Sequence, residues 1–464
     1  MKRYQKLVIM WLCLMNALGA TAVNLSTDGS GQVLLFPYYN VKGGYNSIYS
    51  VVNNSDEAKA IKVRFREGVN LVPVLQFNVY LSPRDVWTGV LTPTAPSDPQ
   101  QEGTISVLHS TVDNSCAPFL HKAGEEFTAV NIPATDSNQS IGRATEGLIE
   151  VLEMGVVVGT SAAALQHDSA GIPSDCELLE SAWSAAGYWE LDGSVDLTLP
   201  TGKLSGAGVL LNMSEGQMVA YDAVALDDFW AADAVHTQPD DALPDLSQGA
   251  PVSLLQTASG YSSATWVNGY QAVSAVLMKS VVNNQYNISP FITGRTDWVI
   301  SWPTKTFHTN PELKAPSTPF SELWDGESSC ESYSLSRNDV NTLAADPVQL
   351  ASCGAIAIVS FKDQFGGPGV FQTNAANEIL IEQTSNNSDI GWASLHFDGN
   401  SHYMVDNEDQ GLLGLPIIGF AVQKYRNAGA GQGLLAQYTE LLEHKYQVFS
   451  FADILFVDGF DQSP

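Results

Sequence analysis

Hydrophobic and polar residues alternate along two stretches in the N-terminal third of the chain. Within residues 61–66, Ile, Val and Phe alternate with Lys and Arg, and residues 75–82 repeat the alternation with uncharged polar partners. Because successive side chains of a strand point to opposite faces, this spacing predicts half-buried strands with one face toward solvent. Polar turn residues at 53–56 and 82–85 separate neighbouring strands. The pattern predicts a mainly β protein, an antiparallel β-sandwich of immunoglobulin-like or jelly-roll type with few short helices.

The same pattern, with its proline-rich interruptions, divides the chain into parts. A leucine spacing typical of a helix occurs only at residues 432–443 and, more briefly, at 175–186, whereas a strand is expected at 272–281. The expected parts are a signal peptide at 1–22, an N-terminal β-sandwich at 23–135, a second β-rich region at 136–302, and a C-terminal β-rich region at 303–464 that contains the helix at 432–443.

The first 22 residues have the three features of an export signal. Three cations precede an apolar stretch at residues 7–18, and Ala20-Thr21-Ala22 forms an A-x-A site, so cleavage is expected after Ala22. The apolar stretch is too short for a hydrocarbon core that needs roughly 20 residues. No later stretch is long enough either, so we expect no transmembrane segment in the mature chain. The expected location is secreted, extracellular or at the cell surface, with the periplasm as an alternative.

Charge changes the picture of possible partners. Residues 1–22 hold three of the 21 Lys and Arg residues and none of the 50 Asp and Glu residues, so the mature chain carries −32. Such a field repels nucleic-acid phosphates and anionic membrane surfaces, and it favours divalent cations or simple solubility. We therefore expect no nucleic-acid partner, and surface polysaccharide or other surface proteins are the candidate partners.

Four cysteines remain after cleavage, an even number that indicates two disulfides in an exported chain. Of the three possible connectivities, the sequential one is favoured, which pairs Cys116 with Cys176 and Cys330 with Cys353. A zinc site lacks its usual support, because the sequence contains no Cys-x-x-Cys.

Imidazoles and a carboxylate near residue 400 offer one candidate metal site. His396, Asp398 and His402 place two imidazoles and a carboxylate within seven residues, a ligand set suited to a transition metal. The turn-forming residues 399–401 between them explain the same residues as an ordinary solvated loop. Both interpretations remain open from the sequence.

The next acidic segment resembles the start of a calcium loop. Asp406, Glu408 and Asp409 supply carboxylates, and a glycine stands sixth, but Ile417 occupies the twelfth position, where an EF-hand needs glutamate. The pattern excludes an EF-hand and leaves a looser calcium site as a hypothesis. Calcium is thus the single candidate cofactor; no other cofactor is expected.

Catalytic motifs are missing from the sequence. It contains no Gly-x-Ser-x-Gly, no His-Glu-x-x-His, no phosphate-binding glycine loop and no dinucleotide fingerprint. A glycosidase would not be detected in this way, because its two carboxylates come from separate strands. Aromatic clusters offer rings that could stack on sugars, although core packing explains them better. These clusters are Trp183, Tyr188 and Trp189; Tyr261, Trp266 and Tyr270; and Trp298 with Trp302.

Several segments resemble a family of exported gammaproteobacterial proteins of unassigned function. They read GQVLLFPYY at 31–39, VRFREG at 63–68 and FNVYLSPRDVW at 77–87, with looser similarity at 296–305 and 414–420. The closing ILFVDGF at 454–460 is similar to the Ile-Phe-x-Asp-Gly-Phe ending of many exported proteins of such bacteria. The resemblance implies a location, and no catalytic residue follows from it.

Together these observations favour an extracellular or cell-surface structural or adhesive β-protein without catalytic activity. The signal peptide, the even number of cysteines, the alternating strands and the missing catalytic motifs all favour this interpretation. The alternatives are a secreted hydrolase that acts on polysaccharide and a module that binds glycan or calcium.

Overall fold

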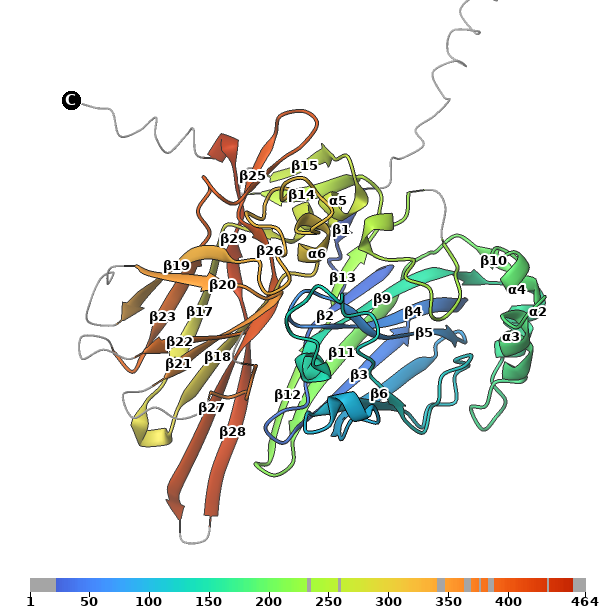
Figure 1. Ribbon diagram of the computed structural model, residues 1–464, viewed down its shortest axis with the longest axis horizontal. Coiled ribbons are helices and arrows are strands. Elements are labelled where there is room, and N and C mark those ends of the chain that lie inside the picture. The colour runs from blue at the N-terminus through green and yellow to red at the C-terminus, as the bar shows by residue number, and fades with distance from the viewer. Residues whose placement is uncertain are drawn as a thin grey trace, which may run out of the picture.

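The structure is a computed structural model that describes residues 22–231, 235–257, 260–339, 347–362, 369–374, 377–382, 388–431 and 434–453. Most of the predicted signal peptide and the closing residues 454–460 lie outside this part of the chain. Two β-sandwiches lie side by side, the first drawn in blue to green and the second in yellow to red (Figure 1). This confirms the predicted fold class, a mainly β protein with few short helices.

The first sandwich pairs a seven-stranded sheet, ordered β1-β13-β2-β9-β4-β5 with β10 beside β9, with a six-stranded sheet, ordered β12-β11-β3-β6-β7-β8. The apolar residues of β4, Ile61, Val63 and Phe65, point between the sheets. The strands of the first sheet are β1 (Asn24–Leu25), β2 (Val33–Asn40), β4 (Ala58–Glu67), β5 (Pro73–Leu81), β9 (Glu146–Val157), β10 (Leu197–Thr198) and β13 (Val224–Asp227). Those of the second are β3 (Tyr45–Asn53), β6 (Val86–Thr94), β7 (Ser106–Ser110), β8 (Glu125–Glu126), β11 (Leu204–Asn212) and β12 (Gln217–Asp222).

The second sandwich has two five-stranded sheets, ordered β20-β19-β23-β17-β29 and β22-β21-β18-β27-β28. Trp298 and Trp302 are fully buried in its core. The strands of the first sheet are β17 (Val281–Asn287), β19 (Glu331–Asp339), β20 (Val348–Ser352), β23 (Ile390–His396) and β29 (Lys445–Gln447). Those of the second are β18 (Arg295–Ser301), β21 (Ile356–Lys362), β22 (Glu378–Glu382), β27 (Ile418–Gly431) and β28 (Leu434–Glu443).

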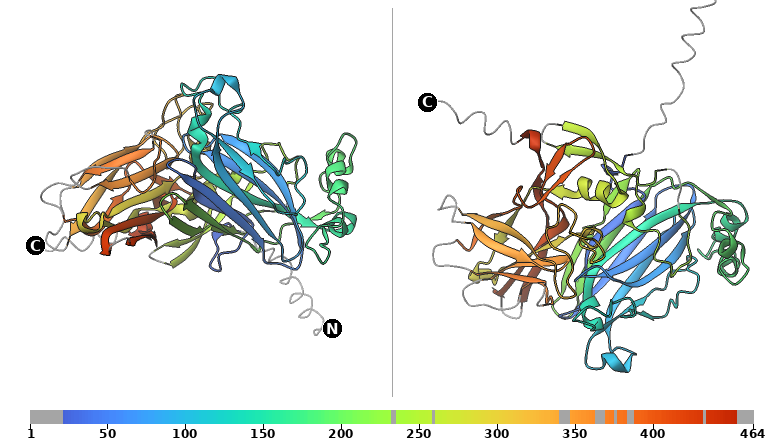
Figure 2. Two further views of the ribbon diagram at one scale, coloured as in Figure 1. Left: turned by 90° about the horizontal axis from the view of Figure 1, so that it is seen from below. Right: turned by 45° about the horizontal axis from the view of Figure 1, so that its top comes forward.

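Small sheets and short helices cover the ends of the two sandwiches. In both views of Figure 2 the helices α2 to α4 lie at the end of the first sandwich that is far from the second. The small sheets pair β14 (Val252–Thr257) with β15 (Gly260–Thr265), β16 (Met278–Lys279) with β26 (Leu415–Pro416), and β25 (Gly411–Leu413) with β24 (Tyr403–Val405) and β30 (Phe449–Ser450). The helices are α2 (Gly159–Leu165), α3 (Cys176–Ala182), α4 (Tyr188–Leu191), α5 (Gly269–Leu277) and α6 (Lys305–His308), with 3-10 turns η1 (Pro99–Gln101), η2 (Ile141–Thr145), η3 (Leu246–Gln248) and η4 (Pro290–Ile292).

The helix predicted at residues 432–443 is wrong, because β28 occupies most of this segment. β28 pairs with β27 in a long antiparallel hairpin, in which Tyr425 stands opposite Tyr438 with their rings 4.8 Å apart. Leu441 packs against the core of the first sandwich and Leu442 against that of the second. Adjacent leucines therefore serve the two faces of a strand, and their spacing only imitates a helix.

The strand predicted at residues 272–281 is also wrong at its start, where the chain forms α5. Asn268 and Gln271 form a capping box in which each side chain bonds the backbone of the other residue. All but two residues of α5 are buried, which hides the helical periodicity behind a continuous apolar run. By contrast, the shorter helix expected at 175–186 is present as α3, capped by Asp175.

The sheets do not follow the boundaries expected after residues 135 and 302. β9 lies at the centre of the seven-stranded sheet, between β2 and β4, and β11 pairs with β3 in the other sheet. β17 and β18 belong to the second sandwich. Strands that composition assigned to different regions therefore pair within one sheet.

The charged face of β4, which we expected to meet solvent, is buried. Residues 235–244 cross it, and Arg64 donates a 2.9 Å hydrogen bond to the carbonyl of Pro244. Arg64 and Arg66 also donate to the Glu150 carboxylate on β9, at 3.3 and 2.7 Å. The two buried cations share one carboxylate, and Arg64 also donates to backbone carbonyls of the covering segment, which compensates for the loss of water.

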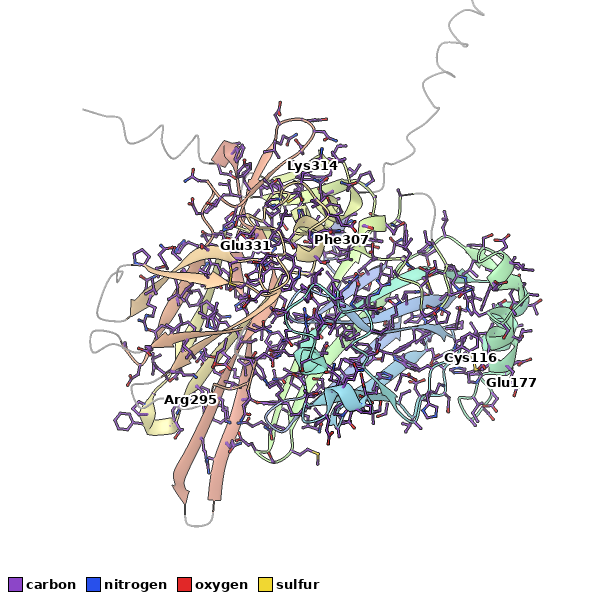
Figure 3. The ribbon with its side chains drawn as sticks, in the orientation of Figure 1. Cys116, Glu177, Arg295, Phe307, Lys314 and Glu331 are labelled. Carbon is purple, nitrogen blue, oxygen red and sulfur yellow. A yellow bond between two sulfur atoms is a disulfide. The ribbon has the colours of Figure 1, made fainter. Side chains whose placement is uncertain are left out.

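Both predicted cysteine pairs are formed. Cys116 and Cys176 have Cα atoms 5.3 Å apart, and those of Cys330 and Cys353 lie 3.8 Å apart. Figure 3 places Cys116 beside the helices at the outer end of the first sandwich. Among the described residues, no helix is long and apolar enough to cross a membrane.

Removing the first disulfide is expected to destabilise the protein more than removing the second. Cys116 and Cys176 are 60 residues apart and Cys330 and Cys353 only 23, and a longer loop restricts the unfolded chain more. The double variant Cys116→Ala, Cys176→Ala should lose about 2–4 kcal/mol of unfolding free energy in urea titrations. An equal or larger loss in Cys330→Ala, Cys353→Ala would contradict this order.

Candidate functional site

The structure does not assemble His396, Asp398 and His402 into a metal site. His402 is buried, and its two ring nitrogens lie 3.0 Å from the carbonyl oxygen of Pro319 and 2.9 Å from that of Ser332. Asp398 accepts hydrogen bonds from Asn400 within the turn. His396 Nε2 lies 3.0 Å from Ser336 Oγ. The three side chains thus have separate hydrogen-bond partners, within the turn for Asp398 and on distant segments for the two histidines.

The acidic segment that begins at Asp406 is the turn between β24 and β25. Asp406 Oδ1 accepts the backbone N–H groups of Glu408 and Gln410, at 2.9 and 2.8 Å. Asp409 adopts a left-handed backbone with φ of 62°. Across the described residues, no group of three or more His, Cys, Asp or Glu side chains is placed to hold a metal ion. The calcium-like pattern is explained by the needs of a tight turn.

Most of the tryptophans considered for sugar stacking are core residues. Trp183 and Trp189 pack against Tyr80 and His236 beneath α3 and α4. Trp266 is buried as well, and Tyr261 stands out because 67 % of its surface is exposed. A single exposed ring offers too small a platform for a sugar chain.

A serine and a histidine lie together in the interior but lack the setting of a catalytic pair. Ser274 Oγ on α5 lies 2.8 Å from His308 Nε2, and His308 Nδ1 lies 2.7 Å from Ser317 Oγ. Both Ser274 and His308 are fully buried, and burial lowers the pKa of His308 to about 3. A base in this state is neutral, has a hydroxyl instead of a carboxylate behind it, and cannot meet substrate. The contact fixes α5 against α6.

Buried carboxylates join the two sandwiches. Glu146 on β9 accepts hydrogen bonds from Tyr38 Oη (2.8 Å), and from the backbone N–H of Asn374 (2.8 Å) and Asn377 Nδ2 (2.9 Å) in the second sandwich. Apolar contact continues beside it, where Tyr221 stacks on Phe420 at 4.9 Å. The core of the first sandwich accordingly includes residues of β18, β21 and β27. The two units form one body.

Two adjoining cavities border this junction, with volumes of about 640 and 590 Å³. The first lies among β14, α5 and β29, and the second between the two sandwiches. They share five lining residues: Leu25, Thr27, Gln256, Lys279 and Tyr446. We call the two together the groove, and each cavity by itself lies within the size range of ligand pockets.

Lys279 is the cation of this groove. It is 7 % exposed, and its Nζ lies 3.9 Å from the centre of the Tyr446 ring. Burial lowers the pKa of Lys279 to about 7. No local pattern in the sequence singles out this residue, because an isolated lysine after an apolar run is typical of a surface position.

A glycosidase needs two carboxylates in one cavity, and few acidic residues line these cavities. The first cavity has no acidic lining residue, and the second has Asp222 and Glu443. A third cavity of about 660 Å³ contains His396 and Asp398 but no second carboxylate. Asp222 and Glu443 are therefore the pair to test for hydrolysis.

No protein family matches the chain, and neither a curated protein nor a solved structure is similar to it. The function must therefore be argued from the residues themselves.

Proposed function

We propose that the protein is an exported, non-enzymatic structural or adhesive protein of the cell surface or extracellular space. The observation that supports this most is the continuous junction of the two sandwiches, in which the Glu146 carboxylate accepts hydrogen bonds from Thr373, Asn374 and Asn377. A shared core and buried polar bonds hold the two units together, as expected of a structural protein. The two disulfides add to this resistance.

The clusters of polar side chains support the same proposal. Ser274 with His308, and Glu150 with Arg64 and Arg66, are buried and occupied by contacts within the protein. Side chains of catalytic type thus act as structural bonds. A polysaccharide hydrolase is the alternative, and its best carboxylates are Asp222 and Glu443 in the second cavity.

Cell fractionation with proteomics tests the location, and a sugar-release assay tests the alternative. We expect the mature chain, beginning at Val23, in the surface or medium fraction, with no release of reducing sugar from polysaccharides of the host surface. A full-length chain in the cytoplasm would contradict export. Sugar release that disappears in the double variant Asp222→Asn, Glu443→Gln would establish the hydrolase instead.

A further inference from the structure

Lys279 differs from the other buried cations of the described residues. Each of the others donates to oxygen atoms: for example, Lys59 pairs with Glu153 at 2.8 Å, and Lys62 donates to the carbonyl of Gln238 at 2.7 Å. No hydrogen bond or ion pair links the ammonium of Lys279 to any described residue. Its one polar contact is the face of the Tyr446 ring. An ammonium with no oxygen partner in the protein is available to pair with an anionic group that enters the groove.

The backbone around Lys279 holds the side chain at the groove. β16 pairs Lys279 with Leu415, and Ser280 Oγ donates to the carbonyl of Leu413 at 2.7 Å. Gly414, with φ of 114°, passes so close that a Cβ on it would lie 2.0 Å from the Lys279 carbonyl oxygen. The backbone at Lys279 is thus held by residues 413–415, and the side chain leaves this fixed point towards the groove.

The walls of the first cavity are mainly apolar. Leu25, Met278 and Val448 line it along with the side-chain amide of Gln256, and no lining residue is acidic. In a chain with a formal charge of −29, an acid-free cavity that contains a buried cation is a local exception. Apolar walls and one positive point charge are complementary to an alkyl chain that ends in one negative charge.

We propose that the first cavity binds a free single-chain carboxylate of the fatty-acid class, with the carboxylate against Lys279 and the alkyl chain along Leu25, Met278 and Val448. The single cation fits a monoanion, whereas a dianionic phosphate would need more donors. This binding site is independent of the proposed surface role.

Calorimetric titration of the full-length mature protein with dodecanoate, below its micelle concentration, tests the proposal. Replacing Lys279 by methionine keeps the apolar stem and removes the charge, and we expect it to weaken binding at least about tenfold, because the carboxylate loses its cationic partner. Lys314→Met is the matched control, because Lys314 is exposed and lines neither cavity (Figure 3). Dodecanol should bind the wild type and Lys279→Met equally.

A second measurement on the wild type does not depend on the variant's folding. Lys279 should react with an amine-acylating reagent at pH 8, as mapped by mass spectrometry, and dodecanoate should protect it while dodecanol does not. Equal dodecanoate affinity in wild type and Lys279→Met, or labelling that dodecanoate leaves unchanged, would overturn the proposal. Neither result would bear on export or on the absence of hydrolysis.

Discussion

Replacing Arg143 by methionine is expected to lower the free energy of unfolding by about 3–5 kcal/mol. Arg143 donates to Glu67 Oε2 and to Asp136 Oδ2, each at 3.0 Å, and all three side chains are 1 % exposed or less. Asp136 also accepts a 2.8 Å hydrogen bond from Trp324 Nε1, which belongs to the loop before β19 in the second sandwich. Without the guanidinium, two carboxylates remain buried and unneutralised. The junction of the sandwiches should weaken with them.

Urea unfolding monitored by tryptophan fluorescence measures the loss. Arg84→Met is the matched control, because the Arg84–Asp56 pair has side chains that are 61 % and 83 % exposed. An exposed ion pair contributes little to stability, so the control should unfold near the wild-type urea concentration. Similar losses in the two variants would contradict the structural role of the buried network.

The second large effect is expected in acid. Burial lowers the pKa of four histidines below its usual value; two of them are fully buried and two are half-buried. The pKa falls to about 4 for His109, His236 and His444 and to about 3 for His308. In the unfolded chain they titrate near 6.5, so unfolding takes up protons between about pH 6.5 and pH 4. The stability that these groups contribute is present above pH 6.5 and is lost as the pH falls through 4.

Buried carboxyls modify this slope without reversing it. Burial raises the pKa of Asp297 to about 6, and this group opposes the histidines because its native form holds a proton that the unfolded form releases. Glu153 and Glu331 have raised pKa values for the same reason, whereas Arg66 and Arg64 lower that of Glu150 against the effect of burial. The four histidines outweigh these carboxyl groups. From pH 7 to pH 4 the free energy of unfolding should fall by on the order of 5 kcal/mol.

Urea titrations at closely spaced pH values give the number of protons taken up on unfolding. His308→Gln should reduce that number by up to one near pH 5, since an amide can still bond with Ser274 and Ser317. His121→Gln, at an exposed position, should leave it unchanged. If the free energy of unfolding increased as the pH is lowered from 6.5 to 4, the histidines would not be buried in the neutral form.

The spacing of hydrophobic residues was sufficient to predict a strand or helix where only one face of the element packs on a core. Ile61, Val63 and Phe65 point between the sheets as their alternation predicts, and α3 begins at the cap that Asp175 provides. The hydrophobic pattern predicted the wrong element where the segment is buried on both of its faces. Residues 272–277 read as a strand because almost every position of α5 is apolar, and Leu441 and Leu442 imitated a helix because each meets a different sandwich.

The sequence by itself determined the mainly β fold class and indicated two disulfides, while it only favoured, among three possible connectivities, the one that the structure then formed. Alternation is a property of neighbours along the chain and the number of cysteines one of composition, so both hold for any arrangement of the strands. Tertiary structure alone decided that the charged face of β4 is covered by residues 235–244 and that Lys279 reaches a cavity without an oxygen partner. Both features depend on which segment, distant in the sequence, packs over a side chain. The spacing of residues along the chain does not contain this information.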